Sequence, residues 1–344
     1  MLSDNEYIDF LNSLPGKTIA IVYIFKGEKA LGFQHYEVWQ SDVISSWLMA
    51  VEEIKCLPLI IDVRTFISKA ANNSLPKIDF VINLSNGATN LSNLGLIPSI
   101  CSFLNIPCIP CNACSIILGE NKKISNIIAN SINLNVPRNL SLTQTNGIMR
   151  PVCYGSSKFV TKNPTKPIDV DYIYQEFIPG YDFTTPLLFN PITETLEVMP
   201  AILYYPNTQD VEWYLGETEK STHRGYTKIS MSLDNKTKNK YIDLAKSLEI
   251  NTFCRIDARL KQEHIDTIDN LRKKQICFDD VFFIEINPMP TIKNDINFHT
   301  SLKALKNNEN MFHCLTIYKN FYSNYSLTGF VLSCSIYSYI KAKH

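Results

Sequence analysis

Two short stretches toward the C-terminal end of the chain place carboxylates at the ends of apolar, β-favouring runs. One is Arg255-Ile-Asp257, and the other runs from Phe282 to Pro288 and carries Glu285 and Asn287. Side chains two residues apart on a strand share a face, so Glu285 and Asn287 should point the same way. If the strand with Asp257 pairs beside them, three oxygen donors converge near Arg255. Carboxylate and amide oxygens suit Mg²⁺, which usually binds together with substrate phosphates.

The same spacing has a plainer interpretation, in which two core strands end in polar residues that reach solvent. Spacing alone leaves both alternatives open. The segments described below favour the metal site.

The cysteines offer a rival site. The chain has ten of them, and only Cys108, Cys111 and Cys114 have metal or redox spacing. No fourth cysteine or histidine lies nearby in the sequence, which favours reduced thiols that line a strand, a turn and a helix. A redox or iron–sulfur protein built on these three residues is the rival. The start of the chain lacks a basic and apolar leader, and this predicts a cytoplasmic protein with free thiols.

Composition limits the classes of function. The chain has 344 residues, enough for two or three domains, and its 33 basic residues balance its 33 acidic ones. No long run of like charge occurs, so we expect neither nucleic acid nor a membrane surface as a partner. The apolar stretch Leu327–Ile340 is too short to span a bilayer, and we expect it to pack on the surface or at a subunit interface.

The first hundred residues have the pattern of a doubly wound α/β layer. Apolar runs of strand length cover residues 18–25, 57–63 and 78–84, with a helical pattern between the first two. Strand, helix and strand at this spacing form a βαβ unit with a parallel sheet. Ligands of such sheets bind beyond the carboxyl ends of the strands, here the loops with Glu37 and Asn86-Gly87. No G-x-G-x-x-G follows the first strand, which argues against a dinucleotide site.

The middle of the chain places a basic residue before a turn of small polar residues. Residues 147–158 form a strand that carries Arg150 and then enters the turn Gly155-Ser156-Ser157. Backbone amides and hydroxyls in such a turn can cradle phosphate, although the same turn is also ordinary loop chemistry. Helical periodicity covers residues 121–132, and Thr208 to Tyr226 is predicted to be a long surface loop.

In sequence order these segments resemble the ATP-grasp ligases, most closely the D-alanine–D-alanine ligase branch, over roughly residues 17–305. The strongest match is Arg255-Ile-Asp257 followed by Glu285-Ile-Asn287, where the family has an Arg-x-Asp strand and a Glu-x-Asn strand. In that family the Asp, Glu and Asn bind two Mg²⁺ ions, and the Arg stabilises the transition state. The resemblance thus assigns Asp257, Glu285 and Asn287 to metal and Arg255 to the developing oxyanion.

The same resemblance assigns residues to the nucleotide and to the first substrate. Arg150-Pro151 with Gly155-Ser156-Ser157 is similar to the family's Lys-Pro-x-x-x-Gly-Ser-Ser, and Ser157 is counted with the catalytic residues. Glu37, with Ser41, is similar to the acidic residue that receives the amino group of the first substrate. The remaining nucleotide-binding assignments are the first phosphate-binding lysine at Lys122, the adenine hinge at Gln175, Glu176, Phe177 and Ile178, a ribose contact at Asp182, and Lys220 as a candidate for the third-domain lysine.

Several positions depart from the ligase pattern. Arg150 replaces a lysine, which keeps the positive charge and changes the geometry. Phe159 stands where the family has a glycine and implies a bulkier phosphate lid. Asn86-Gly87 replaces His-Gly, and the acidic loop that follows it in the ligases is missing. The nucleotide residues are therefore largely matched and the D-alanine pocket is not, so we expect a product other than D-alanyl-D-alanine.

The resemblance implies an α/β fold with a three-domain ATP-grasp architecture. Residues 1–108 would form a domain with a doubly wound parallel sheet, 109–180 an α+β lid domain, and 181–344 an α+β domain with the metal site and an extra tail. The implied activity is ATP-dependent carboxylate–amine ligation with two Mg²⁺ ions, through an acyl phosphate, with release of ADP and phosphate. The partners would be a small-molecule carboxylate and an amine, neither of which the sequence identifies. The sequence also leaves open whether the chain forms a homodimer. The alternative is a non-catalytic nucleotide-binding homologue that acts as a scaffold or regulator.

Overall fold

The structure is a computed structural model that describes residues 4–24, 41–85, 91–155, 157–293 and 326–342, with Asn297, Thr300, Ser301 and Ala304. Several predicted positions lie outside the described residues: Glu37, Asn86-Gly87 and Ser156.

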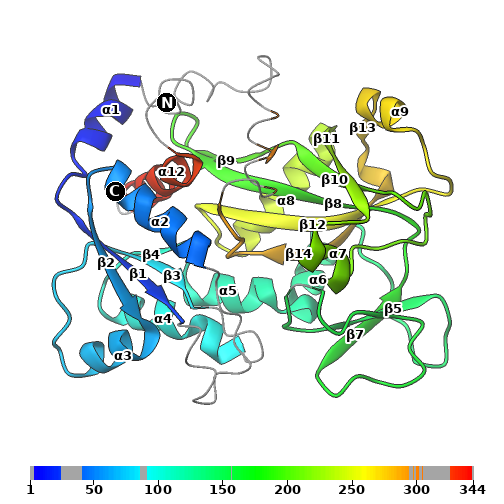
Figure 1. Ribbon diagram of the computed structural model, residues 1–344, viewed down its shortest axis with the longest axis horizontal. Coiled ribbons are helices and arrows are strands. Elements are labelled where there is room, and N and C mark those ends of the chain that lie inside the picture. Colours follow the sequence, from blue (N-terminus) through cyan, green and yellow to red (C-terminus); the bar gives the residue numbers. More distant parts are fainter. Residues whose placement is uncertain are drawn as a thin grey trace.

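The first sheet is parallel and lies between two helical layers (Figure 1). Its elements are β1 (Thr18–Tyr23), α2 (Ser41–Glu53), β2 (Leu57–Asp62), α3 (Val63–Ala71), β3 (Phe80–Leu84), α4 (Leu91–Phe103) and β4 (Cys108–Ile109). The strand order is β2-β1-β3-β4. In β1, Ile19 belongs to the same core cluster as Trp47 of α2, whereas Ala20 belongs to a second cluster with Phe66 of α3. Alternate residues thus face opposite layers, which confirms the predicted doubly wound sheet.

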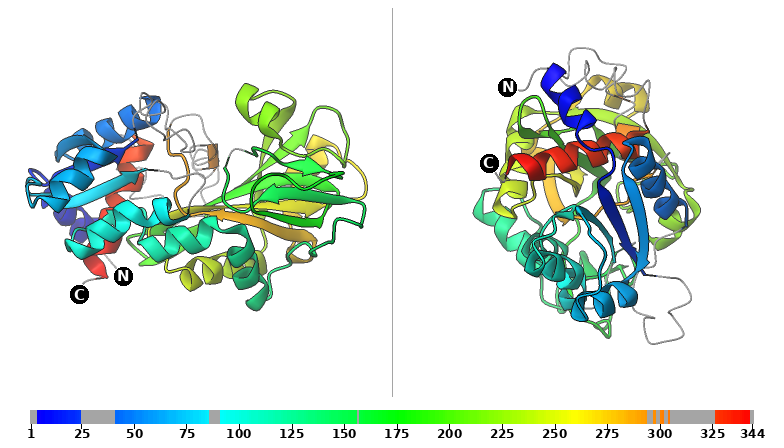
Figure 2. Two further views of the ribbon diagram at one scale, coloured as in Figure 1. Left: turned by 90° about the horizontal axis from the view of Figure 1, so that it is seen from below. Right: turned by 90° about the vertical axis from the view of Figure 1, so that its left-hand side faces the viewer.

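A small antiparallel sheet follows, with the order β6-β5-β7. Its strands and the two helices before it are α5 (Ala113–Glu120), α6 (Lys122–Ser131), β5 (Gly147–Pro151), β6 (Thr161–Lys162) and β7 (Tyr172–Glu176). The predicted helix over residues 121–132 is confirmed as α6. Figure 2 shows α5 and α6 running along the molecule from the first sheet toward the other two sheets.

The largest sheet is mixed and has seven strands, in the order β13-β11-β10-β8-β12-β14, with β9 paired to β8. Its strands are β8 (Gly180–Asn190), β9 (Thr195–Val198), β10 (Ala201–Pro206), β11 (Tyr226–Leu233), β12 (Phe253–Lys261), β13 (Gln275–Ile276) and β14 (Val281–Asn287). The accompanying helices are α7 (Glu217–Thr222), α8 (Asn235–Ser247), α9 (Ile268–Lys273) and the 3₁₀ turn η2 (Phe278–Asp280). The prediction of a long surface loop from Thr208 to Tyr226 is wrong at α7, where residues 217–222 form a helix.

The C-terminal helix α12 (Leu327–Lys341) corrects another prediction. The apolar stretch was expected on the surface or at a subunit interface, but its residues from Leu327 to Ser338 are buried within this chain, against α2 and β8. Its polar residues are bonded inside the fold: Ser335 donates to the carbonyl of Val331, and the Ser333 hydroxyl lies 2.8 Å from that of Tyr7 in α1 (Asp4–Asn12). Polar interruptions in the sequence therefore do not mark an exposed face here, because the serine hydroxyls of α12 have partners in their own helix or in segments packed against it.

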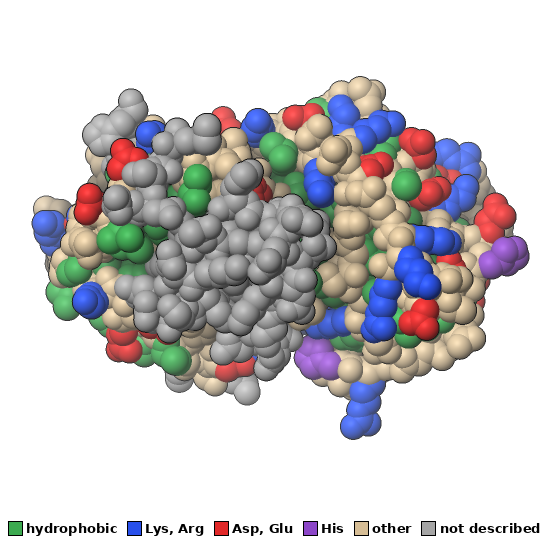
Figure 3. All heavy atoms as spheres, turned by 90° about the horizontal axis from the view of Figure 1, so that it is seen from above, with side chains coloured by type: hydrophobic (Ala, Val, Ile, Leu, Met, Phe, Trp, Pro, Cys, Tyr) green, Lys and Arg blue, Asp and Glu red, His purple; other side chains and the backbone are tan. Residues whose placement is uncertain are grey.

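The surface matches the balanced composition. Figure 3 shows Lys and Arg side chains together with Asp and Glu side chains over the half of the molecule that carries the large sheet. Among the described residues, no helix combines the length and the apolar content needed to cross a membrane.

Candidate active site

Strand pairing gathers the predicted chemical residues on one face of the large sheet. Strand β12 pairs antiparallel with β14, so that Asp257 lies opposite Glu285 and Arg255 lies opposite Asn287. On its other side β12 pairs with β8, where Thr184 lies opposite Asp257. Residues opposite one another in a sheet share a face. The predicted pairing of the two strands is therefore confirmed.

Asp257 is the most extensively bonded carboxylate of this face. Arg255 donates from Nε to Oδ1 at 2.9 Å and from Nη2 to Oδ2 at 2.8 Å. Thr184 Oγ1 donates to Oδ1 at 2.6 Å, and Asn287 Nδ2 donates to Oδ2 at 3.1 Å. Burial alone would lower the pKa of Arg255, but the adjacent Asp257 carboxylate raises it above its ordinary value. The pair is thus a fixed guanidinium–carboxylate unit.

Glu285 lies among positive charges. Lys122 Nζ is 3.0 Å from Oε2 and also donates to the carbonyl of Tyr154 at 2.9 Å. Burial would raise the pKa of Glu285, but the charges of Lys122, Lys220 and Arg150 together hold it well below its ordinary value. The third-domain candidate Lys220, on α7, is thus one of the cations whose charge lowers the pKa of this carboxylate.

Local sequence explains how Lys122 reaches the site. Asn121 is the N-cap of α6, and its Oδ1 accepts from the N–H groups of Lys123 and Ile124 at 3.0 and 3.2 Å. Asparagine is favoured at this position because its side chain satisfies N–H groups that lack partners within the helix. The cap starts a new helix directly after α5 and turns Lys122 and Asn126, four residues apart, to the same buried face.

Arg150 is a buried cation whose hydrogen-bond partners among the described residues are neutral groups. Its side chain is 6 % exposed, Nη2 donates to Gln175 Oε1 at 2.5 Å, and Nη1 donates to the carbonyl of Ile284 at 3.2 Å. Among the described residues, Nε has no hydrogen-bond partner. Burial lowers the pKa of Arg150, and the nearby negative charges of Glu285 and Asp182, which would raise it, offset this only in part. A buried guanidinium with two neutral acceptors favours an anion nearby.

Arg259, which the sequence patterns did not single out, organises the predicted adenine hinge. Its Nε donates to the carbonyl of Ile178 at 2.6 Å, and Nη2 donates to Gly180 and Trp213 carbonyls at 2.9 and 3.1 Å. The guanidinium carbon lies 4.7 Å from the ring centre of Phe177. A signal was present, because Arg259 lies two residues after Asp257 and so shares its face.

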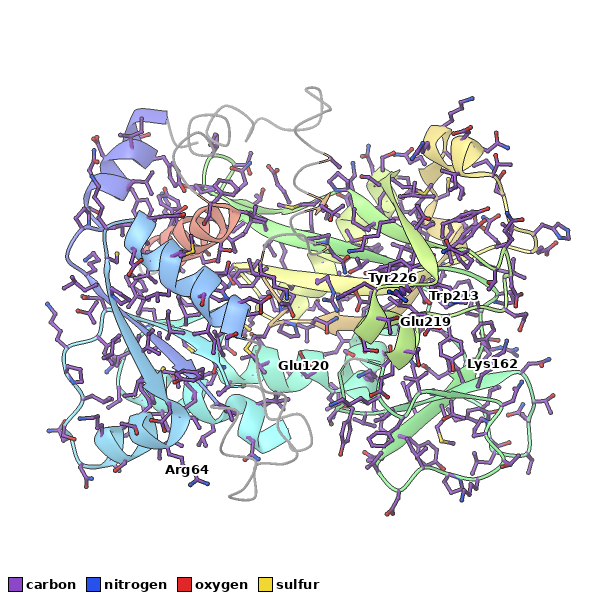
Figure 4. All side chains as sticks on the ribbon, in the orientation of Figure 1. Arg64, Glu120, Lys162, Trp213, Glu219 and Tyr226 are labelled. Carbon is purple, nitrogen blue, oxygen red and sulfur yellow. The ribbon has the colours of Figure 1, made fainter. Side chains whose placement is uncertain are left out.

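The predicted ribose residue Asp182 is bonded to protein groups. Its Oδ2 lies 3.0 Å from Arg259 Nη1 and accepts from the N–H of Leu215 at 2.7 Å. The loop before α7 is also bonded to the small sheet, because Ser157 Oγ donates to the Leu215 carbonyl at 2.9 Å and Lys162 forms an ion pair with Glu212. Figure 4 shows this loop's Trp213 near Glu219 and Tyr226.

The predicted cysteine cluster falls into different environments. Cys108 and Cys111 are buried, and Cys114 is exposed. A hydrogen bond that the Cys108 thiol donates to Cys101 raises the pKa of Cys108, as does burial, and burial raises that of Cys111. In the described part of the chain, no three His, Cys, Asp or Glu side chains converge on a metal position. The candidate set at the sheet face has two carboxylates and the amide of Asn287.

The comparison with solved structures identifies the fold. No family model matches the sequence, and no curated protein matches it. Among solved structures, the D-alanine–D-alanine ligase from Bacillus anthracis, complexed with ATP, has a TM-score of 0.61 at 12% identity and covers 95% of this chain and 98% of its own. The VanG D-Ala:D-Ser ligase from Enterococcus faecalis has a TM-score of 0.56 at 16% identity and covers 84% of this chain and 95% of its own. The D-alanyl-alanine synthetase A from Vibrio cholerae has a TM-score of 0.63 at 13% identity and covers 95% of this chain and 99% of its own.

The chain therefore has the ATP-grasp fold of the D-alanine–D-alanine ligases, as the sequence motifs predicted. At this level of identity the likeness concerns the fold. The roles of the individual site residues and the domain limits stay predictions.

Proposed function

We propose that this protein is an ATP-dependent carboxylate–amine ligase that forms an acyl phosphate and releases ADP and phosphate. The observation that carries the proposal is the set of cations at Glu285: Lys122 Nζ is 3.0 Å from its Oε2, Arg150 donates to the carbonyl of the preceding Ile284, and the charge of Lys220 lowers its pKa. Three cations around one carboxylate leave excess positive charge in a largely buried site, which favours a polyphosphate. The fold shared with a ligase solved with ATP supports a nucleotide as that anion.

In the proposed reaction, a substrate carboxylate attacks the γ-phosphorus of ATP, and the bond to the bridging oxygen breaks and releases ADP. An amine then attacks the acyl carbon, loses a proton, and phosphate leaves. Lys122, Arg150 and Lys220 would supply fixed positive charge to the phosphates. Arg255 would stabilise the charge that develops on the acyl oxygen, an interaction that is strongest in the transition state.

The oxygen donors of the site fit Mg²⁺. Asp257, Glu285 and Asn287 offer two carboxylates and an amide on one sheet face, the hard ligands that this ion takes together with phosphates. Bound there, Mg²⁺ would neutralise phosphate charge. The bonds from Arg255 and Thr184 to Asp257 orient that carboxylate and would be shared or exchanged on binding.

The substrates proposed are a small molecule with a free carboxylate, such as an amino acid or peptide, and a second molecule with an amine. Arg150, Phe159 and the uncharged segment after Asn86-Gly87 depart from the ligase pattern. We therefore propose a product other than D-alanyl-D-alanine.

A second candidate is a nucleotide-binding protein without ligase activity, acting as a scaffold or regulator. One observation favours it: each site carboxylate already has a cationic partner, Arg255 for Asp257 and Lys122 for Glu285. A site that is paired in this way can bind a nucleotide without turnover.

The test is ADP release from ATP and Mg²⁺ against a panel of amino acids and amino-acid pairs, with ATP binding measured by calorimetry. Release that requires both a carboxylate and an amine supports the ligase. ATP binding without release for any member of the panel favours the second candidate. A protein that does not bind ATP contradicts both.

A further inference from the structure

Strand β14 carries a β-bulge at Ile284. Asp257 pairs with Glu285, and the next residue of β12, Ala258, pairs with Phe283, so Ile284 has no partner in the ladder. Ala258 and Phe283 are buried in the core, whereas Asp257 and Glu285 face the site. On a regular strand Phe283 and Glu285 would share a face, because side chains alternate. The extra residue is therefore what places Glu285 opposite Asp257 while Phe283 stays in the core.

The carbonyl of the bulge residue is bonded by side chains from outside the sheet. Strand β14 is an edge strand, so its outer polar groups need partners other than another strand. The Ile284 carbonyl accepts from Asn126 Nδ2 at 3.3 Å and from Arg150 Nη1 at 3.2 Å. Two donors from two different elements, α6 and β5, thus meet at one oxygen.

Gln175, from β7, connects these two donors to each other. Its Oε1 accepts from Arg150 Nη2 at 2.5 Å, and its Nε2 donates to Asn126 Oδ1 at 3.1 Å and to the Pro137 carbonyl at 3.0 Å. The three side chains are 7 % (Asn126), 6 % (Arg150) and 1 % (Gln175) exposed. Buried polar groups destabilise a fold unless they are bonded, so this network has a defined geometry.

We propose that Asn126, Arg150 and Gln175 are positioning residues that fix the bulge at Ile284 and thereby set the Glu285 carboxylate relative to Asp257. The inference rests on the proposed function, in which Glu285 is a metal ligand. It gives Arg150 and Gln175 a role besides phosphate and adenine contacts, and it adds Asn126 to the site.

The chain offers a matched control for Asn126. Asn135 Nδ2 donates to the carbonyl of Val281, the first residue of the same strand, and to that of Phe278 in the turn η2 just before it, both at 3.1 Å. Asn126→Ala and Asn135→Ala therefore each remove one side-chain amide that bonds a backbone carbonyl of β14. Of these bonds, only the one from Asn126 is made at the bulge residue Ile284.

The experiment measures Mn²⁺ binding by electron paramagnetic resonance, with and without a non-hydrolysable ATP analogue, and unfolding in urea. Loss of a residue that orients a metal ligand commonly weakens metal binding by about 10- to 100-fold. We expect at least a tenfold loss for Asn126→Ala and a change within about twofold for Asn135→Ala, with similar losses of stability in both. Asn126→Asp, which keeps the acceptor for Gln175 and removes the donor to Ile284, should resemble Asn126→Ala and serves if that variant fails to fold.

The possible results separate the two claims. If the wild-type protein binds Mn²⁺ and both Asn126 variants bind it as tightly as the wild type, the positioning role is overturned. Equal weakening by Asn126→Ala and Asn135→Ala also overturns it, because the effect would then belong to the strand as a whole. Wild-type protein that binds no Mn²⁺ with or without the nucleotide overturns the metal assignment itself.

Discussion

At the scale of single residues, the two acidic groups of the site have different surroundings. Asp257 is bonded by one guanidinium and two neutral groups, Thr184 and Asn287. Glu285 lies near cations, and their charges keep its pKa well below the ordinary value although burial would raise it. A carboxylate that stays ionised at neutral pH suits a metal ligand and does not suit a general acid.

The first prediction concerns Glu285. Glu285→Gln should reduce ligation by about 10²–10³-fold, because it removes a charged group from the site and leaves Lys122 without its carboxylate partner. Asp279→Asn, at an exposed carboxylate just before the same strand, is the control. Turnover of each substrate pair and unfolding in urea are measured. Near-normal turnover in a cooperatively folded Glu285→Gln protein would contradict the metal assignment.

The second prediction concerns Arg259. Arg259→Lys keeps the charge but loses most of the bonds to the carbonyls of Ile178, Gly180 and Trp213. Hydrogen bonds from a charged donor contribute about 1.5–3 kcal/mol each, so we expect the KM for ATP to rise about tenfold or more with a smaller change in kcat.

The control for Arg259 is Arg138→Lys. Arg138 is exposed and pairs with Glu176 at the same hinge. Solvent screens an exposed ion pair, so the KM for ATP should change by about a few-fold at most. Equal effects of the two substitutions would contradict a special role of Arg259.

At the scale of elements, the chain uses side-chain caps to start the helices that frame the site. Asp234 is the N-cap of α8, where Oδ1 accepts from the N–H of Thr237 at 2.7 Å and Oδ2 from the N–H of Phe278 at 2.9 Å. One carboxylate thus joins the start of α8 to the turn before β14. Burial would raise the pKa of Asp234, but these hydrogen bonds lower it below the ordinary 3.8.

The third prediction follows from this cap. A carboxylate with a lowered pKa in the folded state contributes stability above its unfolded pKa and loses it as the pH falls through the folded pKa. Asp234→Ala should lower the free energy of unfolding at pH 7 by about 1 kcal/mol. The difference from wild type should shrink as the pH is lowered below 3.8. Urea unfolding at several pH values checks it, and a difference that stays constant down to the acid limit would contradict it.

At the scale of the whole molecule, α12 joins parts of the fold that are far apart in the sequence. The ring of Tyr337 lies 5.1 Å from that of Phe10 in α1 and 6.4 Å from that of Phe189 in β8. Ser338 Oγ donates to the carbonyl of Asn251 at 2.6 Å, and Ser46 of α2 lies 2.6 Å from Thr328. The helix thus packs between the first sheet's helices and the large sheet.

The fourth prediction tests this arrangement. Tyr337→Ala should lower the free energy of unfolding by about 3 kcal/mol, because it removes a buried aromatic ring that contacts two parts of the fold. Phe103→Ala, at a side chain that is 86 % exposed, should change it by about 0.5 kcal/mol or less. Both are measured by urea unfolding. Similar losses in the two variants would show that α12 adds little to the packing.

Local patterns were sufficient for much of this protein. Apolar runs predicted the parallel strands, the Asn121 cap agrees with the predicted helix, and period-two spacing placed Glu285 and Asn287 on one face. These features follow from interactions within a few residues, so neighbouring residue types are enough to specify them.

Other features depended on the tertiary structure. The face on which Glu285 lies relative to Phe283 depends on a bulge whose carbonyl is bonded by Asn126 and Arg150, more than a hundred residues away. The burial of α12 depends on partners in α1 and β8. By itself, the sequence determined the parallel strands β1, β2 and β3, the helix α6 and the residue types on β12 and β14, but it did not reveal α7. Only the tertiary structure decided which residues meet, because pairing register and long-range polar contacts are set by groups that no local spacing records.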